Sequence, residues 1–359
     1  MKVSRSARSA VAGLAIALLL GGLLAVALGY PPIAGLRALL HYSLGTGPKR
    51  ALTVTNAVPL LLTGLSAAIA FASGPVNLGQ PGQVLMGALA AVTLGLHLHL
   101  PPAVQVPALI AASTLGGAAW AGVAAMARRR LGMDEFIVTL MLNEVARLFC
   151  DWVISSPLQD RGAGSVTTRT IDRAGFIPQL GGWSASVAIG AVAVIVAWIV
   201  CRRLVVGYEW RMAGQAPLFA RLGGVEVDRN YSAALAFSGG FAGLAGGVLL
   251  LAGPHRFVKG LGGNYGWDGV MIAVVAVNAL LGVVLYGLLF SALQTGAIGM
   301  EILADIPAEF IQILQAIIVL VTVAARGALT EALGRRSAGR LARRQRAAAT
   351  GADADGADP

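Results

Sequence analysis

Three amide side chains lie in a short break between two apolar runs. The segment Gly74–Gln83, GPVNLGQPGQ, places Asn77, Gln80 and Gln83 among glycines and prolines. Proline and glycine interrupt a helix, and at membrane depth the freed backbone groups need hydrogen-bonding partners. Such a break is tolerated where it is buried in protein or lines an aqueous cavity. The amides are therefore expected either to satisfy this backbone or to contact a polar solute, and a tight turn at the membrane surface is the alternative.

A charged group lies within a later apolar run. Glu144, Arg147 and Asp151 are spaced i, i+3 and i+7, so they share one face of a helix. Unpaired charges there would cost about 2.5–3.5 kcal/mol each. We expect them to pair and to face the interior of the bundle as a structural ion pair, with a proton or solute relay as the alternative. Asn143 beside them and Asn278 in a later run are candidates for lining a solute path.

Residues 207–230 form a polar island between two long apolar runs. Pro217 suits the first turn of a helix, and Gly223 and Gly224 suit its end. A helix this short is not stable alone in water. The pattern therefore favours a short exposed helix on which another molecule docks.

Three glycines, Gly239, Gly243 and Gly247, recur every four residues in an apolar run. This spacing allows two helices to approach backbone to backbone. We expect these residues to form a helix-packing face.

No group of residues indicates catalysis. No G-x-x-x-x-G-K-[ST] sequence surrounds Lys2, Lys49 or Lys259, so this chain is not expected to hydrolyse ATP. His97 and His99 would diverge on a helix and have no acids or thiols nearby, which argues against a metal site. The sequence predicts no cofactor and no enzyme activity.

The composition is that of an integral membrane protein. It is 57% apolar and 12% charged, whereas soluble domains are about 25% charged. Barrel-type alternation is missing, so we predict an all-α protein with about ten transmembrane helices. The first run is interpreted as an uncleaved anchor rather than a signal peptide because its apolar core is long. The predicted spans are 9–29, 51–73, 82–97, 103–127, 135–153, 184–201, 231–253, 268–283, 284–302 and 306–325.

The basic residues indicate orientation. With the N-terminus inside, 18 Lys and Arg fall in inner segments and 8 in outer segments. This bias predicts a cytoplasmic N-terminus, C-terminus and polar island. The net charge of +10 is thus a topology signal and not a sign of nucleic-acid binding. Residues 1–330 are expected to form the transmembrane domain, and residues 331–359 a disordered tail.

Five segments resemble one family of proteins. In order, the chain contains NLGQPGQVLMGA, DEFIVTLMLNEVARLF, AGQAPLFARLGGVEVDRN, SGGFAGLAGG and GNYGWDGVMIAVVA. They are similar to the motifs of bacterial ABC-importer permeases of the sugar and nucleoside type, and together they cover most of residues 55–325. The chain departs from the family at Pro81, where glutamate is usual, at Gln215–Pro217, and at Val277–Leu280, where Arg-Asn-Asn-Pro is common. These departures bear on the solute more than on the mechanism.

The resemblance implies a set of partners. It implies a permease subunit in a bacterial plasma membrane that works with cytoplasmic ABC ATPase subunits, a second permease subunit and an extracytoplasmic solute-binding protein. The solute would be a nucleoside or simple sugar. The polar island would dock the ATPase through Pro217, Leu218, Phe219, Arg221 and Leu222. The alternatives are a secondary, ion-coupled transporter and, for the island, a basic loop lying on anionic lipid.

Overall fold

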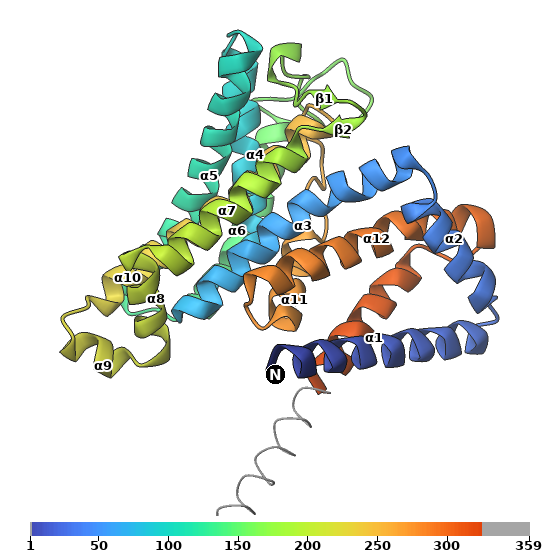
Figure 1. Ribbon diagram of the computed structural model, residues 1–359. Coiled ribbons are helices and arrows are strands. Elements are labelled where there is room, and N and C mark those ends of the chain that lie inside the picture. The colour runs from blue at the N-terminus through green and yellow to red at the C-terminus, as the bar shows by residue number, and fades with distance from the viewer. Residues whose placement is uncertain (1, 325–359) are drawn as a thin grey trace, which may run out of the picture. The chain divides into compact units, whose positions relative to one another are not determined.

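The structure is a computed structural model that describes residues 2–324 (Figure 1). It divides into two units, one formed by residues up to Pro32 together with those from Glu309, and the other by Ile33–Ala308. In the first unit, α1 (Lys2–Ala27) packs against the helix Glu309–Ala324. Tyr30 and Phe310 meet edge to face there, with ring centroids 6.5 Å apart. The two helices are antiparallel, because Gly13 lies against Thr322 at one end of this pairing and Tyr30 against Phe310 at the other.

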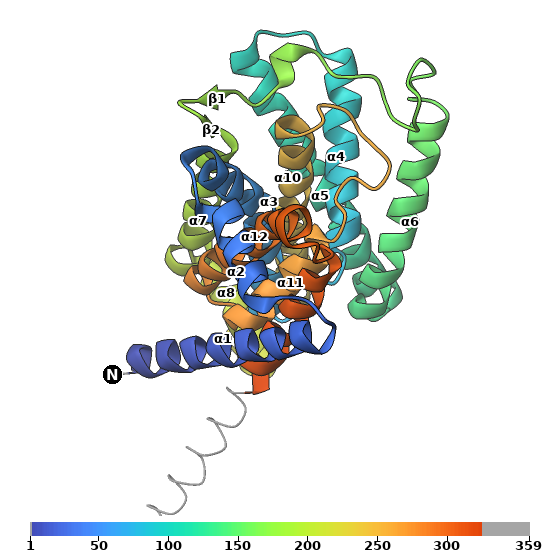
Figure 2. The same ribbon diagram turned by 90° about the vertical axis from the view of Figure 1, so that its right-hand side faces the viewer.

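The second unit contains the remaining elements (Figures 1 and 2). Its helices are α2 (Pro32–Leu44), α3 (Gly47–Ser73), α4 (Gln80–His97), α5 (Pro102–Leu131), α6 (Glu135–Ser155), α7 (Ser186–Arg203), α8 (Val205–Gln215), α9 (Pro217–Leu222), α10 (Val227–Ala252), α11 (Tyr265–Ala276) and α12 (Leu280–Ala304). A 3₁₀ turn (Arg173–Gly175) and an antiparallel pair, β1 (Gln179–Leu180) and β2 (Trp183–Ser184), lie between α6 and α7.

Five of these helices, α3, α5, α7, α10 and α12, are long and apolar enough to cross a membrane. In the described part of the chain nearly all regular structure is helical, since the strands span two residues each. The prediction of an all-α, multi-pass membrane protein is confirmed in its fold class and in having several membrane-spanning helices.

Some predicted boundaries are wrong. Helices α2 and α8 lie in stretches that the sequence analysis assigned to connections. The predicted boundary between residues 283 and 284 is also wrong, because α11 ends at Ala276 and α12 begins at Leu280. Val277 and Asn278 take left-handed conformations, with φ of 52° and 55°, which end α11. A β-branched residue such as Val277 rarely adopts this conformation, so the apolar sequence provided no reason to expect a helix end there. Asn278 was the only residue type at this point that favours a left-handed turn.

Helices α4, α5 and α10 form the tightest part of the core, and they lie side by side in both views (Figures 1 and 2). Gly239, Gly243 and Gly247 of α10 lie against α5. A Cβ atom on Gly243 would be 2.7 Å from the Cα atom of Gly117 and would also meet the carbonyl oxygen of Ser113. The two backbones are therefore in direct contact, which leaves no room for a side chain at this point.

An ordered layer covers one end of the second unit. The backbone amide of Thr168 donates to the carbonyl of Phe257, and that of Ile171 donates to the carbonyl of His255, both over 3.0 Å. The His255 ring stacks on Phe176 with centroids 3.6 Å apart, and its burial lowers the pKa of the imidazole. Residues 156–185 and 253–264 thus hold each other in place above the helices.

Candidate functional site

The break after α3 is buried. Gly74 ends α3 with φ of +104°, and α4 begins at Gln80. Asn77 and Gln80 are 0% exposed and Gln83 is 1% exposed. An exposed turn at the membrane surface would leave such amides in water, so the structure has the protein-buried form of the break.

Two of the amides pair with each other and with the backbone. The Asn77 Nδ2 atom donates to the Ser238 hydroxyl of α10 at 2.7 Å and to Gln83 Oε1 at 3.2 Å. Gln83 Nε2 donates back to Asn77 Oδ1 at 2.9 Å. The same oxygen accepts from the amide of Gly79 at 2.9 Å. Asn77 and Gln83 therefore fix the shape of the break and attach it to α10.

Asn143 of α6 holds the other side of the break. Its Nδ2 atom donates to the Leu78 carbonyl at 2.9 Å, and its Oδ1 atom accepts from the Gly82 amide at 2.9 Å. The Leu78 amide donates to the Thr139 hydroxyl at 3.3 Å. Gly82 lies in the first turn of α4, where backbone amides have no partner within the helix. One side chain thus satisfies backbone groups that the break leaves unpaired.

Asn143→Ala is expected to lower the free energy of unfolding by about 1–3 kcal/mol, because it leaves the buried Gly82 amide without a partner. Thermal unfolding of the purified protein in detergent measures the effect. Asn56→Ala is the matched control, since the Asn56 amide makes one contact, at 3.4 Å, to the Thr295 hydroxyl. Equal melting temperatures for the two variants would contradict this role of Asn143.

Gln80 and Asn278 are not part of this network. Neither polar atom of the Gln80 side chain has a hydrogen-bonding partner within residues 2–324, although both are buried. Asn278 lies in the turn between α11 and α12, and its Oδ1 atom is also unpartnered in the described structure. Of the five predicted path residues, the structure therefore brings Asn77, Gln83 and Asn143 together around the break.

The charged group on α6 pairs as predicted. Arg147 contacts Glu144 at 2.7 Å and Asp151 at 3.5 Å. The prediction that these residues face the interior of this chain is wrong, because the side chains of Arg147 and Glu144 are 51% and 64% exposed. Helix α6 packs on α4 and α5 along one side, and its charged face lies outside that contact.

A cavity of about 280 Å³ lies between α4, α6 and the start of α11. Pro81, Asn143, Arg147, Asp151 and Trp267 are among its lining residues. The exposed charges of α6 therefore form one wall of a pocket whose other walls are mainly apolar, and they are not simply solvated.

Two helices begin at this pocket. A Cβ atom on Gly266, in the first turn of α11, would lie 2.7 Å from the Cα atom of Pro81, in the first turn of α4. Helix N-termini carry partial positive charge, which favours electron-rich groups of a ligand, although the Gly82 amide of α4 is already bound by Asn143. The pocket can therefore offer hydrogen-bond donors, charges of both signs and an aromatic surface to a small polar molecule.

Two further residues of this region, Trp267 and Asp268, were not predicted as site residues from the sequence. Trp267 is 41% exposed and lines the pocket. Asp268 is 5% exposed and accepts a hydrogen bond from Gln294 of α12 at 2.7 Å. An acidic residue close to an apolar run was a signal for Asp268. Trp267 had no local signal, since its place in the pocket depends on α4 and α6.

Helix α9 presents apolar side chains to solvent. Leu218, Phe219 and Leu222 are 74%, 64% and 81% exposed. Ala220, on the opposite face, is 2% exposed and packs with Ala213 of α8 and Val227 of α10. The short helix is thus anchored by one small residue, and its large apolar residues are mostly exposed. Arg221 makes a long ion pair with Asp228, at 3.7 Å.

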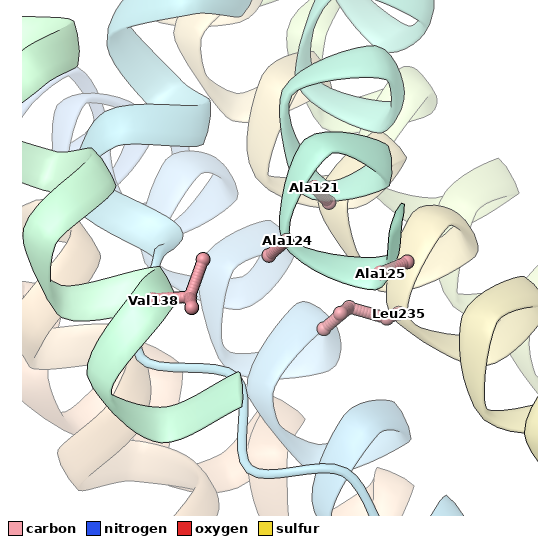
Figure 3. Close-up of a cluster of buried hydrophobic side chains, with 5 residues drawn as sticks. All are labelled: Ala121, Ala124, Ala125, Val138 and Leu235. Carbon is pink, nitrogen blue, oxygen red and sulfur yellow. The ribbon is translucent and has the colours of Figure 1, made fainter. Parts of the chain in front are cut away.

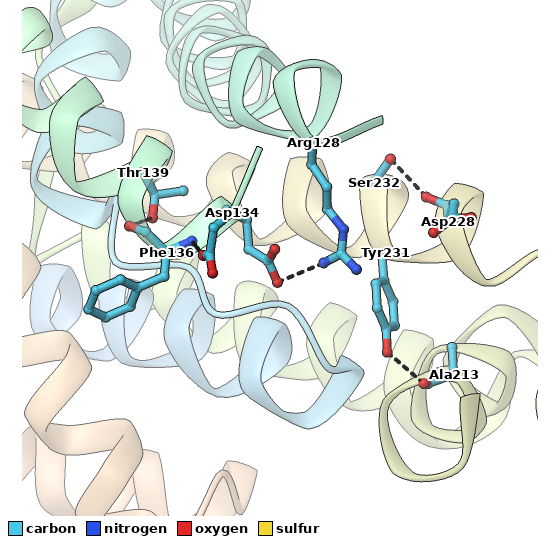
Figure 4. Close-up of polar contacts among 9 residues, drawn as sticks. Arg128, Asp134, Phe136, Thr139, Ala213, Asp228, Tyr231 and Ser232 are labelled. Atoms are coloured by element: carbon cyan, nitrogen blue, oxygen red, sulfur yellow. Dashed lines mark hydrogen bonds and ion pairs between the residues drawn. The ribbon is translucent and has the colours of Figure 1, made fainter. Parts of the chain in front are cut away.

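Side-chain contacts connect the ends of α5, α6, α8 and α10 (Figure 4). Arg128 at the end of α5 pairs with Glu135 of α6 at 2.6 Å, and its guanidinium lies 4.6 Å from the ring centroid of Tyr231. The Tyr231 hydroxyl donates to the carbonyl of Ala213 in α8 at 2.7 Å. A continuous chain of contacts through Arg128 and Tyr231 therefore links α8 to α6, the helix that lines the pocket.

Comparison with known proteins places the chain in a family. Residues 51–323 match the family model described as branched-chain amino acid transport system, permease component. The guanosine ABC transporter permease protein NupP of Bacillus subtilis is 31% identical over 84% of this chain and 88% of its own length.

Two further relatives have similar coverage. The glucose ABC transporter permease protein TsgB13 of Haloferax volcanii is 28% identical over 85% of this chain and 83% of its own length. The nucleoside ABC transporter permease protein NupB of Lactococcus lactis is 28% identical, over 84% and 86%. The family match and the apolar helices lead to the same conclusion: the chain belongs to the branched-chain amino acid transport system permease family and is a membrane permease subunit of an ABC importer.

Proposed function

We propose that this permease carries a nucleoside or a simple sugar through a path that includes the pocket between α4, α6 and α11. The observation that supports this most directly is the meeting of the α4 and α11 N-termini at a cavity that also has charged side chains of α6 in its wall. Discontinuous helices with their ends at a solute site are typical of transporters. The named solutes of the relatives, guanosine, nucleoside and glucose, favour this solute class.

The predicted path residues divide into two roles in this proposal. Asn143 lines the pocket and also holds the break, whereas Asn77 and Gln83 support the break from behind. The side-chain oxygens of Gln80 and Asn278 have no partner within residues 2–324, and a solute or a moving helix satisfies them during transport. Trp267 supplies a face on which a base or sugar ring stacks.

We also propose that energy comes from a separate subunit. A cytoplasmic ABC ATPase docks on the exposed face formed by Pro217, Leu218, Phe219, Arg221 and Leu222. The ATPase subunit, and not this chain, binds and hydrolyses ATP. In this proposal both termini are cytoplasmic and the chain crosses the membrane about ten times, so α9 lies on the cytoplasmic side; the distribution of Lys and Arg supports this orientation.

Two further partners complete the importer in this proposal. A second permease subunit, identical or homologous, packs beside this one in a bacterial plasma membrane. An extracytoplasmic solute-binding protein delivers the solute at the end covered by residues 156–185 and 253–264. Backbone hydrogen bonds between these two segments hold the layer in one conformation, which supports its use as a docking surface.

The proposed function predicts ATP-driven uptake in proteoliposomes that contain this permease, its ATPase and its binding protein. Labelled guanosine and labelled glucose are the two probes. Uptake of one of them should need both ATP and the ATPase and should persist when a protonophore removes the proton gradient. Uptake that continues without the ATPase and stops with the protonophore would favour the secondary transporter instead.

A further inference from the structure

A groove with basic and apolar parts lies where the end of α5 meets the start of α10. Its volume is about 600 Å³, within the usual range for ligand sites. Its lining residues are Gly122, Ala125, Met126, Arg129, Arg130, Arg229, Ser232 and Ala233.

The two parts of the groove lie at different depths. Arg129 and Arg130 occupy the last turn of α5, one of the five long apolar helices. Gly122 lies about 10 Å further back along the same helix, at 1.5 Å per residue. Arginines at the end of an apolar span lie at the level of the lipid headgroups, so Gly122 and Met126 lie at the level of the acyl chains.

The groove is open at its apolar end. Ala121, Ala124, Ala125, Val138 and Leu235 form a buried cluster that closes the contact between α5, α6 and α10 (Figure 3). A Cβ atom on Gly122 would meet nothing within 4 Å, and Met126 is 54% exposed. The helices thus pack closely on one side of Gly122 and leave free space on the other.

The arginines of the groove form no ion pair within residues 2–324. Arg128 is paired with Glu135, and Arg221 with Asp228. Among residues 2–324, Arg129, Arg130 and Arg229 form no ion pair, and no acidic side chain lines the groove. Three positive charges therefore converge on a cavity that lacks a negative group.

We propose that this groove binds an anionic phospholipid. The phosphodiester accepts hydrogen bonds from Arg129, Arg130 and Arg229, while an acyl chain lies along Gly122 and Met126. A zwitterionic lipid would bring a cation next to the same arginines, and a soluble anion would leave the apolar part empty. Arg129 and Arg229 also line an adjoining cavity with Arg221 of α9, so the lipid lies next to the proposed ATPase-docking region. Glu226 and Asp228 line that adjoining cavity but not the groove.

The test is native mass spectrometry of protein extracted from vesicles of equal parts phosphatidylglycerol and phosphatidylcholine. Wild type should retain phosphatidylglycerol in preference to phosphatidylcholine. The double variant Arg129→Gln, Arg229→Gln should lose this preference on the order of tenfold, since each basic residue near the surface contributes. Gly122→Leu should reduce retention without any change of charge, because it fills the space for the acyl chain.

The matched control is Arg202→Gln with Arg203→Gln, which removes the same charge at the end of α7. Melting temperatures in detergent show whether each variant is folded. An equal loss of phosphatidylglycerol in the control would show a general charge effect and overturn the site. Full displacement of the lipid by millimolar glycerol phosphate would also overturn it, in favour of a site for a free anion.

Discussion

Phe219→Ala combined with Leu222→Ala is expected to abolish ATP-driven uptake while the permease remains folded in the membrane. These side chains are 64% and 81% exposed and have no core to support. Substitutions at such positions usually change the free energy of unfolding by less than about 0.5 kcal/mol. Large apolar residues at the centre of an interface, in contrast, each contribute about 2 kcal/mol or more to binding. Two of them together correspond to a loss of ATPase affinity on the order of a thousandfold.

The measurements are solute uptake and co-purification of the ATPase from the same membranes. Leu204→Ala with Val205→Ala is the matched control, because these residues are 48% and 71% exposed and lie at the start of α8, whereas α9 follows the end of α8. The control should transport normally. Normal uptake by the α9 variant, with the ATPase still bound, would rule out docking through this face.

Gly243→Leu is expected to prevent α10 from packing on α5. A Cβ atom at this position would be 2.7 Å from the Gly117 Cα atom. The atoms that it meets belong to the backbone of α5, so no change of side-chain rotamer can make room for it. Overpacking of a core costs about 1–3 kcal/mol when side chains can adjust, and the cost here should exceed that range because whole helices must separate. Because α4 packs on the same two helices, the effect should extend to the break that contains Asn77.

Size-exclusion chromatography in detergent and thermal unfolding report this effect. We expect aggregated protein or a strongly lowered melting temperature. Gly122→Leu adds the same volume on α5 where a Cβ atom meets nothing within 4 Å, so that variant should remain monodisperse. If Gly243→Leu unfolds at the same temperature as Gly122→Leu, the close contact does not support the core.

The local features of the chain were predictable from residue type and order. Long apolar runs bounded by proline, glycine or arginine predicted α3, α4, α5, α6, α7 and α10 to within a few residues. Pro217 and Gly223 predicted α9, and the i, i+3 and i+7 spacing predicted the Arg147 ion pairs. These signals need only neighbouring residues, because helix start, helix end and side-chain spacing on one face are set by local backbone geometry.

The tertiary structure decided which neighbouring element, cavity or solvent each helix face meets. Whether Arg147 faces the bundle interior or a cavity depends on which side of α6 packs on α4, and no periodicity within α6 contains that information. The division of residues 265–304 depended on a left-handed turn at Val277 inside an apolar run.

The pocket itself needed three segments that are far apart in the sequence. Pro81, Asn143 and Trp267 meet because glycine allows α11 to begin against the first turn of α4, while Asn143 holds the same turn from α6. The sequence by itself therefore determined a helical membrane permease, the residues that break a helix and those that pair on one helix face. Only the folded chain decided which of them share a cavity, because close packing of distant segments, and not local spacing, brings those side chains together.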